Sequence, residues 1–335
     1  MKIALLQGKN TTSRVFHPSQ LERLQRLGAE LVINPQEGWM TAEQVADYVA
    51  GADVLITSWG CPPLDAALLN RAPGLRAVLH AAGSVKPVVT PELWRRGIRV
   101  SSAAAELSRG VGETALGLTL VTLKNLWEVT VESKTGGWWN RQSDGVRSRI
   151  REMYGVTIGC IGAGHAGRRY MSLLQPFHVE VLLADPTLTP EQAEQLGGRL
   201  VTLDELLTAS DVVTVLAPEL PSTYHMLNDR TLGLMKDDAI LINLARGSLV
   251  DEEALVKHLE CGRLFACLDV TEPEPPAPDH PFRTLPNVLL TGHIAGAVNN
   301  GLYALGHFVV DELQRLLNGE PLEGEVREEQ LHLMA

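Results

Sequence analysis

Short apolar runs alternate with amphipathic segments through the first hundred residues. Each short apolar run predicts a strand, and each amphipathic segment between two runs predicts a helix. The predicted strands are Lys2–Leu6, Leu31–Asn34, Val54–Thr57, Ala77–Leu79 and Arg99–Ser101. The predicted helices are Ser19–Leu27 and a segment ending at Ala50 that opens with a capping box of Thr41 and Gln44. This alternation is typical of a mostly parallel α/β sheet.

A long apolar segment follows, from about Ser108 to Val131. We expect it to form one helix that is buried on more than one side. The polar segment Ser133–Met153 predicts a connecting loop.

The alternation resumes after residue 185 and continues to the last helix. Helices are predicted at about 203–209, 229–235 and 251–261, and an amphipathic helix from Gly296 to Asn318. The predicted strands are Val212–Leu216, Ala239–Asn243, Leu264–Asp269 and Val288–Thr291.

Between these two regions a strand leads into a glycine-rich turn. The turn reads Gly162-Ala-Gly164-His165-Ala166-Gly167, and a helix-like run and a second strand follow it. In a G-x-G-x-x-G motif the first glycine allows a tight turn and the second lets the backbone approach a pyrophosphate at a helix N-terminus. The third glycine lets the helix pack closely on its strand. A chain with 30 glycines produces chance matches, but the ordered strand, helix, strand and terminal acid indicate a dinucleotide site.

The acid that ends the second strand indicates which dinucleotide binds. Asp185 lies 18 residues after Gly167 and is placed to accept hydrogen bonds from the adenosine ribose. Because a carboxylate repels a 2′-phosphate, we expect NAD rather than NADP. We expect His165, at a variable position of the turn, to contact solvent or phosphate.

Three polar residues follow three successive late strands. Arg246, Glu274 and His293 each come shortly after an apolar run. In an open parallel sheet, ligands bind outside the carboxyl ends of the strands, so these side chains are expected at one edge. The arginine fork matches a carboxylate, the histidine exchanges a proton near neutral pH, and a carboxylate beside the ring orients it. Each residue alone is more often structural, but the joint placement predicts a catalytic site.

The sequence around these residues resembles the D-isomer-specific 2-hydroxyacid dehydrogenases, over nearly the whole chain. The resemblance rests on Leu244-Ala-Arg246-Gly-Ser-Leu-Val-Asp251-Glu-Glu-Ala-Leu255, on Leu268-Asp-Val-Thr-Glu-Pro-Glu274-Pro and on Gly292-His293-Ile-Ala-Gly. It implies two doubly wound parallel-sheet α/β domains, a flavodoxin-like substrate domain and a Rossmann cofactor domain. The expected boundaries are 1–105 for the first part of the substrate domain, 106–294 for the cofactor domain, and 295–335 for a returning helix and tail.

The resemblance also implies roles for the residues. Arg246 would bind the substrate carboxylate, His293 would be the acid and base on the C2 oxygen, and Glu274 would pair with His293. Glu272 is the rival for the glutamate, and Glu274 is preferred because the family places its acid five residues after the strand aspartate, here Asp269. The remaining positions expected at the cofactor are Gly162, Gly164, His165, Ala166, Gly167, Asp185, Ala217, Pro218, Ala245, Asp269 and His293. No metal is expected.

The sequence departs from the family at the substrate loop and nearby. The usual G-V-G-x-D loop reads Ala82-Gly83-Ser84-Val85-Lys86 here, so backbone donors remain but the pocket differs. The arginine typical of members that act on phosphoglycerate is absent before Ser58, which weakens a phosphorylated substrate. Trp59 lines an apolar pocket or belongs to ordinary packing, and whether His80 or Lys86 contacts substrate is left open.

Composition excludes some functions and leaves others. The net charge of −11 argues against a nucleic-acid surface. Four cysteines without C-x-x-C spacing suggest reduced thiols in a cytoplasmic protein. We expect neither a signal peptide nor a membrane span, no further regulatory domain, and a homodimer.

The sequence therefore predicts an NAD-dependent oxidoreductase that interconverts a D-2-hydroxy acid and its 2-oxo acid in a cleft between the domains. The alternative is an NAD(H)-responsive, corepressor-like binding module with little turnover.

Overall fold

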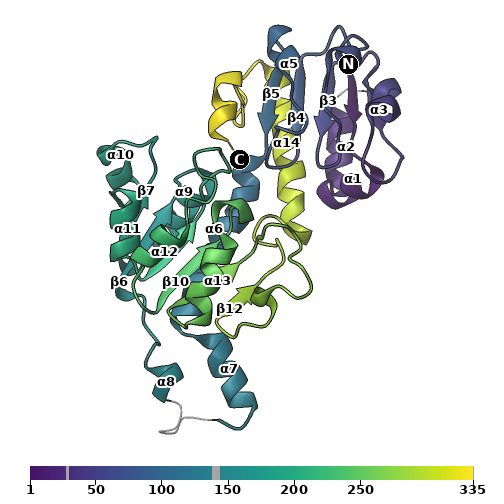
Figure 1. The fold of residues 1–335 in the computed structure, drawn as a ribbon. Coiled ribbons are helices and arrows are strands. Elements are labelled where there is room, and N and C mark those ends of the chain that lie inside the picture. Colours follow the sequence, from purple (N-terminus) through teal and green to yellow (C-terminus); the bar gives the residue numbers. More distant parts are fainter. Residues whose placement is uncertain (28–29, 138–143, 335) are drawn as a thin grey trace. The chain divides into compact units, whose positions relative to one another are not determined.

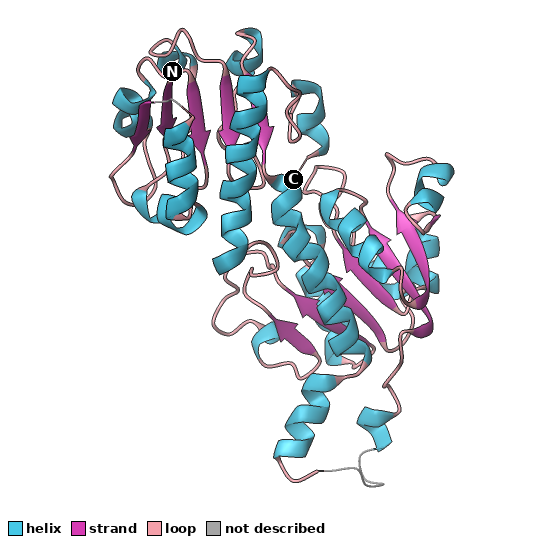
Figure 2. Cartoon of the chain, turned by 180° about the vertical axis from the view of Figure 1, so that it is seen from behind, coloured by secondary structure: helices cyan, strands magenta, loops and turns pink. Residues whose placement is uncertain are grey.

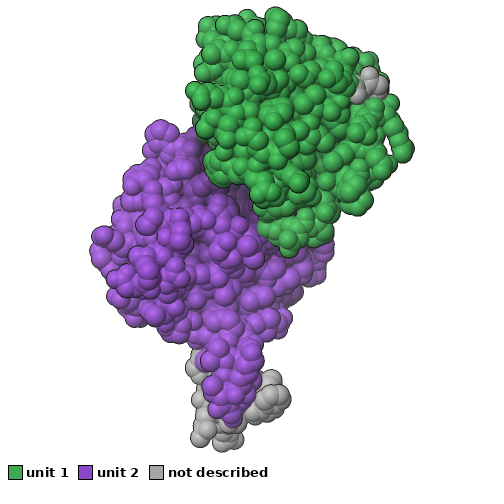
Figure 3. Space-filling model, turned by 90° about the vertical axis from the view of Figure 1, so that its right-hand side faces the viewer, with its two compact units in different colours: residues 1–108, 297–335 green, residues 109–296 purple. Residues whose placement is uncertain are grey.

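The computed structural model describes residues 1–27, 30–137 and 144–334. These residues form two compact units (Figure 1, Figure 3). Unit 1 comprises Met1–Ser108 and Ala297–Ala335, and unit 2 comprises Arg109–Gly296. The boundaries expected from the sequence were 105/106 and 294/295.

Unit 1 is built on a five-stranded parallel sheet in the order β2-β1-β3-β4-β5, which is the flavodoxin-like order predicted. Its strands are β1 (Lys2–Leu5), β2 (Glu30–Ile33), β3 (Val54–Thr57), β4 (Ala77–His80) and β5 (Arg99–Ser102). Its helices are α1 (Lys9–Val15), α2 (Pro18–Arg26), α3 (Ala42–Val49), α4 (Ala66–Leu69), α5 (Pro91–Arg95) and α14 (Leu302–Asn318). The expected strands and helices of this region lie within about two residues of those observed.

Helices cover both faces of this sheet, which explains why most residues of β1, β3 and β4 are apolar (Figure 2). Ile3 and Leu5 of β1 pack in one core with the apolar face of α14. Ala4 and Leu6 point to the opposite face, into a core with α3, α4 and α5. The buried carboxylate of Glu312 holds α14 to the C-terminal segment by accepting hydrogen bonds from the Ser101 hydroxyl and from the backbone of residues 323 and 324.

Unit 2 is built on a seven-stranded parallel sheet in the order β12-β11-β10-β9-β6-β7-β8. Its strands are β6 (Tyr154–Ile161), β7 (His178–Ala184), β8 (Arg199–Leu200), β9 (Val212–Val215), β10 (Ala239–Asn243), β11 (Leu264–Leu268) and β12 (Val288–Leu290). Its helices are α7 (Leu126–Lys134), α8 (Asp144–Arg147), α9 (His165–Leu174), α10 (Pro190–Gln195), α11 (Leu203–Ala209), α12 (Asp229–Leu234) and α13 (Glu252–Glu260). Together with unit 1 this confirms two doubly wound α/β domains.

The predicted long helix is divided in two. α6 (Ala104–Leu123) begins earlier than expected, and α7 begins after Asn125, whose φ of 50° is left-handed and ends the first helix. Within one chain, the described residues of the two helices show burial on one side at most. α6 buries one stripe, Val111, Ala115 and Thr119, and α7 has no buried residue.

Two further expectations need correction. The last helix begins at Leu302 rather than Gly296, because Val298 is extended and Asn299 has a φ of 47°. The expected loop Ser133–Met153 contains α8, and its residues 138–143 lie outside the described part of the chain. The elements α1, α4, α5, α10 and β8 were not predicted from the sequence. No helix among the described residues is long and apolar enough to span a bilayer.

Candidate active site

The glycine-rich turn joins β6 to α9 in unit 2. Gly162 has a φ of 95°, and a Cβ there would lie 2.7 Å from the backbone of Ala217, so only glycine fits. A Cβ on Gly167 would lie 2.1 Å from the carbonyl oxygen of Gly162, so α9 packs directly on the turn. Around the Cβ position of Gly164, the N-cap of α9, no atom lies within 4 Å. The helix N-terminus is therefore open to an anion such as a pyrophosphate.

Asp185 follows β7 and contacts the same turn. Its Oδ2 accepts a hydrogen bond of 2.7 Å from the Ala163 N–H, and its Oδ1 accepts two from Thr187. A carboxylate has about four acceptor positions, so one is still open to a ribose hydroxyl. The residues present thus fit a dinucleotide with its pyrophosphate at α9 and its ribose at Asp185.

A buried asparagine shapes the turn that carries Arg246. Asn243 ends β10, and its side chain accepts a hydrogen bond from the Ala245 N–H and donates one to the Arg246 carbonyl oxygen. Nη1 of Arg246 donates to the Ala245 carbonyl oxygen at 2.7 Å, and the side chain is half-buried. Asn243 was not predicted as a site residue. The signal in the sequence that could have indicated it is its position, as a polar residue at the end of the apolar strand Ala-Ile-Leu-Ile.

A second buried polar residue shapes the turn that carries His293. Asp269, 3% exposed, follows β11, and its carboxylate accepts hydrogen bonds from Thr291 Oγ1 and from the N–H groups of Ile294 and Ala295. Its carbonyl oxygen accepts the His293 N–H at 2.7 Å. Asp269 was predicted to contact the cofactor, and in the structure its side chain organises the histidine turn.

His293 lies next to Glu274. Nδ1 of His293 is 2.7 Å from Oε1 of Glu274, and both side chains are partly exposed. The rival Glu272 lies instead near His225, with 3.8 Å between its Oε2 and Nε2 of that histidine. In this contact the Glu274 carboxylate accepts a hydrogen bond from Nδ1–H of His293. The other ring nitrogen, Nε2, is therefore the one that can face a substrate.

The three turns that carry these residues follow adjacent strands, since β10, β11 and β12 are neighbours in the sheet. The turn that carries Arg246 (the arginine turn) and the loop that carries Glu274 (the glutamate loop) are in contact through their backbones. A Cβ on Gly247 would lie 2.1 Å from the carbonyl carbon of Thr271 and 2.6 Å from the nitrogen of Glu272. The position of Arg246 is therefore coupled to the start of the loop that carries Glu274.

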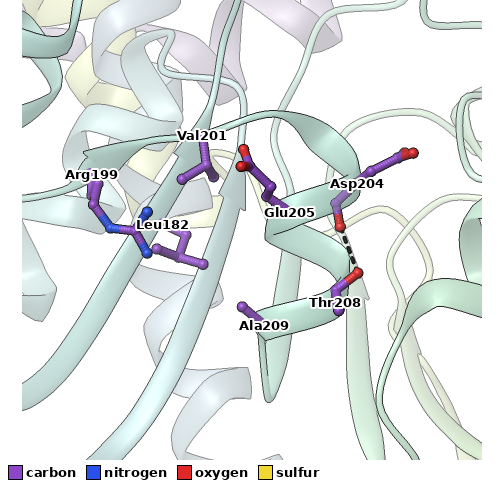
Figure 4. A pocket seen from close by; sticks show the side chains of 7 residues that line it. All are labelled: Leu182, Arg199, Val201, Asp204, Glu205, Thr208 and Ala209. Carbon is purple, nitrogen blue, oxygen red and sulfur yellow. Dashed lines mark hydrogen bonds between the residues drawn. The ribbon is translucent and has the colours of Figure 1, made fainter.

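Two hollows lie on unit 2. One of about 510 Å³ is lined by Glu274, Asp269, Thr271, Thr291 and Arg283, beside the histidine turn. Another of about 470 Å³ lies between α11 and strands β7 and β8, where Leu182, Arg199 and Glu205 are among the lining side chains (Figure 4). Among the described residues, the second contains none of the predicted catalytic side chains. No group of three metal-ligating side chains is found in the described chain.

The predicted substrate loop lies in unit 1, after β4. Ser102 Oγ donates to the Gly83 carbonyl oxygen at 2.6 Å, and Ala82 is buried. His80 lies beneath the loop, 2.9 Å from the Thr57 hydroxyl and hydrogen-bonded to the Ser84 backbone. Burial lowers the pKa of His80 to about 4, so this histidine is neutral at pH 7 and supports the loop.

The two other residues left open at this loop have different surroundings. The ammonium of Lys86 donates to the carbonyl oxygen of Met334, in the C-terminal segment of the same unit. Trp59 follows β3 and is 42% exposed, so it is only partly packed.

The buried thiols are unreactive. Burial raises the pKa of Cys61, Cys160 and Cys267 to about 12, so each is protonated at neutral pH.

Comparison with known proteins places the chain in a family. Residues 116–295 match the model of the D-isomer specific 2-hydroxyacid dehydrogenase, NAD binding domain. The chain is 34% identical to the glyoxylate reductase of Thermococcus gammatolerans, over 87% of both proteins. It is 32% identical to the D-3-phosphoglycerate dehydrogenase of Methanocaldococcus jannaschii over 86% of this chain and 54% of that protein. The chain thus spans about half the length of that relative.

Solved structures agree with the fold. A protein of Thermus thermophilus is 30% identical and superposes with a TM-score of 0.77, covering 98% of this chain and 100% of that one. A phosphoglycerate oxidoreductase of Rhizobium etli is 25% identical with a TM-score of 0.83, covering 98% and 99%. The glycine turn, the acid after β7 and these matches lead to one conclusion: the chain belongs to the D-isomer-specific 2-hydroxyacid dehydrogenase family, and residues 116–295 form its NAD-binding domain.

Proposed function

We propose that this protein is an NAD-dependent oxidoreductase that interconverts a D-2-hydroxy acid and its 2-oxo acid. Arg246 binds the substrate carboxylate and polarises the C2 carbonyl, and His293 carries the proton that this oxygen gains or loses. Glu274 holds the histidine ring, and Ala82, Gly83 and Ser84 supply backbone groups for the substrate. The observation that supports this most directly is the bond of 2.7 Å between Glu274 and His293, next to the arginine turn.

In reduction, NADH held at the glycine turn and Asp185 would supply the hydride that C2 of the 2-oxo acid receives. The C2 oxygen then gains negative charge, and Nε2 of protonated His293 donates a proton to it. The Glu274 carboxylate at Nδ1 favours the protonated ring before transfer and orients it during transfer. In oxidation the neutral ring accepts the same proton, so both directions use one pair of residues.

Arg246 fixes the substrate by its fork-shaped guanidinium. Two parallel N–H donors match the two oxygens of a carboxylate and set the direction of the C2–O bond. Alignment of this kind accounts for a large part of enzymatic rate enhancement. The site therefore selects 2-oxo and 2-hydroxy acids as a class.

The remaining cofactor contacts follow the glycine turn. Gly162, Gly164, His165, Ala166 and Gly167 hold the pyrophosphate side. Ala217, Pro218, Ala245, Asp269 and His293, together with Asp185, complete the site at the strand ends.

A test is NADH oxidation, followed at 340 nm, with glyoxylate, hydroxypyruvate, pyruvate and phenylpyruvate as substrates. We expect turnover with one or more of them and its near loss in His293→Ala, which still binds NADH. Binding of NADH without turnover of any 2-oxo acid would contradict the proposal and favour the corepressor-like module instead.

A further inference from the structure

The loop that carries Glu274 has few groups of its own to hold it. Four of the nine residues from 272 to 280 are prolines, which have no N–H to donate. Two of its carbonyl oxygens, those of Pro276 and Ala277, accept hydrogen bonds from Arg283. The two ends of the loop must be fixed by other means, because the position of Glu274 against His293 depends on them.

One carboxylate contacts both ends of this loop. Glu252 lies in the first turn of α13 and is largely buried, with a side-chain exposure of 12%. Its Oε1 accepts the N–H of Glu272 at 2.8 Å, where the loop begins. Its Oε2 lies 3.4 Å from Nε2 of His280, where the loop ends.

The contact with His280 survives in either protonation state of the ring. Nδ1 of His280 accepts a hydrogen bond from the Phe282 N–H, so the proton of the neutral ring is on Nε2. Nε2–H therefore faces Glu252 whether the histidine is neutral or charged. The carboxylate of Glu252 spans the loop from residue 272 to residue 280, and Glu274 lies between them.

We propose that Glu252 is a positioning residue, which acts through the ends of the 272–280 loop to hold Glu274 against His293. This inference rests on the proposed roles of Glu274 and His293. It assigns to Glu252 a task beyond the favourable interaction of an acidic first turn with the dipole of α13.

The hydrogen bond between Glu252 and the Glu272 N–H can form in either protonation state of the Glu252 carboxyl group. Burial raises the pKa of Glu252 to about 7, and the nearby Glu272 carboxylate adds to this rise. The hydrogen bond from the Glu272 N–H acts in the opposite direction and lowers the pKa. The carboxyl oxygen that accepts this N–H can do so in the neutral form as well as in the charged form. His280 faces Glu252 directly, and His225 faces Glu272.

The test uses the pH dependence of 2-oxo acid reduction in the full-length protein. Glu252→Ala removes both contacts, so the alkaline limb of kcat/KM should move to lower pH by about half a unit or more, as in Glu274→Gln. We expect kcat to fall by roughly 10-fold, with the KM for NADH within about twofold of wild type. Glu252→Gln keeps an oxygen for the Glu272 N–H but turns an NH2 donor towards Nε2–H of His280, so it should return the limb only part of the way to its wild-type pH.

Controls separate positioning from a general loss of stability. Glu253→Gln changes the same helical turn at an exposed position and should leave the limb unmoved. Glu252→Ala combined with Glu274→Gln should move the limb no further than Glu274→Gln alone, because both act through one contact. If Glu252→Ala does not fold, Glu252→Asp, which draws the carboxylate back by one methylene, serves in its place.

The inference would be overturned if the alkaline limb of kcat/KM moves in Glu274→Gln but stays at its wild-type pH in Glu252→Ala. The proposed function would remain intact. If the wild-type protein reduces no 2-oxo acid, the proposed function fails instead. In that case the ring ¹⁵N signals of His293 still decide the inference, because Glu252→Ala must change them if the contact of Nδ1 with Glu274 is lost, and Glu253→Gln must not.

Discussion

Two consecutive residues, Gly292 and His293, have positive φ angles of 69° and 59°. A histidine in this region costs on the order of 1 kcal/mol, so the turn persists only where its surroundings hold it. Here the buried Asp269 carboxylate, with three hydrogen bonds to the turn, does so. The result is a histidine whose Nδ1 meets Glu274 while its backbone is fixed to β11.

The charge of Glu274 is expected to determine the pH range of reduction. Glu274→Gln keeps the shape of the side chain but removes the charge that stabilises the protonated ring, so the alkaline limb should move to lower pH. The measurement is kcat/KM for a 2-oxo acid between pH 5 and 10. If only Glu272→Gln moves the limb, the glutamate has been assigned wrongly.

Lysine is expected to fail in place of Arg246. A point charge cannot bind two carboxylate oxygens in a fixed direction, so Arg246→Lys should lose on the order of 100-fold in kcat/KM. Steady-state kinetics with a 2-oxo acid measures this, and NADH affinity serves as the control. Near-normal kinetics would remove Arg246 from the substrate site.

Asp185 is expected to set the preference for NADH over NADPH. Asp185→Ser removes a carboxylate that accepts from the ribose of NADH and repels the 2′-phosphate of NADPH. The ratio of kcat/KM with NADH to kcat/KM with NADPH should therefore fall. The same variant loses the bond from the Ala163 N–H, so absolute KM values should rise for both cofactors. The ratio is thus the informative quantity, and equal use of NADPH by the wild type would contradict the assignment.

At the scale of elements, the strands were predictable because both faces of each sheet are covered. A strand buried on both sides is mostly apolar, as in the Ala-Ile-Leu-Ile run of Ala239–Asn243, and its limits are then visible in the sequence. The glycine turn was predictable because Gly162 and Gly167 meet local steric requirements, while Gly164 leaves the helix N-terminus open. The break at Asn125 was not, because asparagine adopts both helical and left-handed conformations and only the tertiary structure selects one.

The position of Arg246, Glu274 and His293 after three neighbouring strands was also predictable, but the residues that support their turns were not. Asp269 and Glu252 accept hydrogen bonds from backbone N–H groups 25 and 20 residues away, whereas Asn243 holds the turn that directly follows it. A sequence pattern shows which residue follows a strand. It does not show which carboxylate will meet a particular N–H group.

The contact between the arginine turn and the glutamate loop can be tested by the substitution Gly247→Ala, which adds one methyl group. A Cβ in Gly247→Ala would overlap the backbone of Thr271 and Glu272, which cannot move as a flexible side chain does. We expect a loss of roughly 10-fold or more in kcat/KM and a lower melting temperature.

Gly233→Ala is the matched control for this substitution. Gly233 lies in α12 with no atom within 4 Å of its Cβ position, so alanine there should be neutral or stabilising by up to about 1 kcal/mol. Wild-type kinetics in Gly247→Ala would mean that the two turns are not rigidly coupled.

At the scale of the whole molecule, unit 1 needs both ends of the chain. Leu305, Val309 and Leu313 of α14 pack with Ile3 and Leu5 of β1, so part of one face of the first sheet is uncovered until the last helix is present. Unit 2 is instead continuous in sequence. We infer that loss of residues after 301 would destabilise unit 1 far more than unit 2.

The helices α6 and α7 of unit 2 carry apolar side chains that their own chain leaves exposed. Leu120, Leu126 and Val131 are 37%, 47% and 61% exposed, and they lie where the sequence predicts a buried helix. An apolar surface of this kind is typical of an interface between subunits. We therefore keep the prediction that the protein is a homodimer, formed through the NAD-binding domain as the family resemblance implies.

Light scattering at micromolar concentrations is expected to give the mass of two chains, each of 36.4 kDa. Leu120→Glu combined with Val131→Glu places two charges on the proposed interface and should shift the mass towards one chain, because burying unpaired charges is unfavourable. Tyr154→Glu, at an equally apolar and 75% exposed position on β6, is the control and should remain dimeric. A wild-type monomer across this range would refute the dimer, and a dimer that survives both charges would place its interface elsewhere.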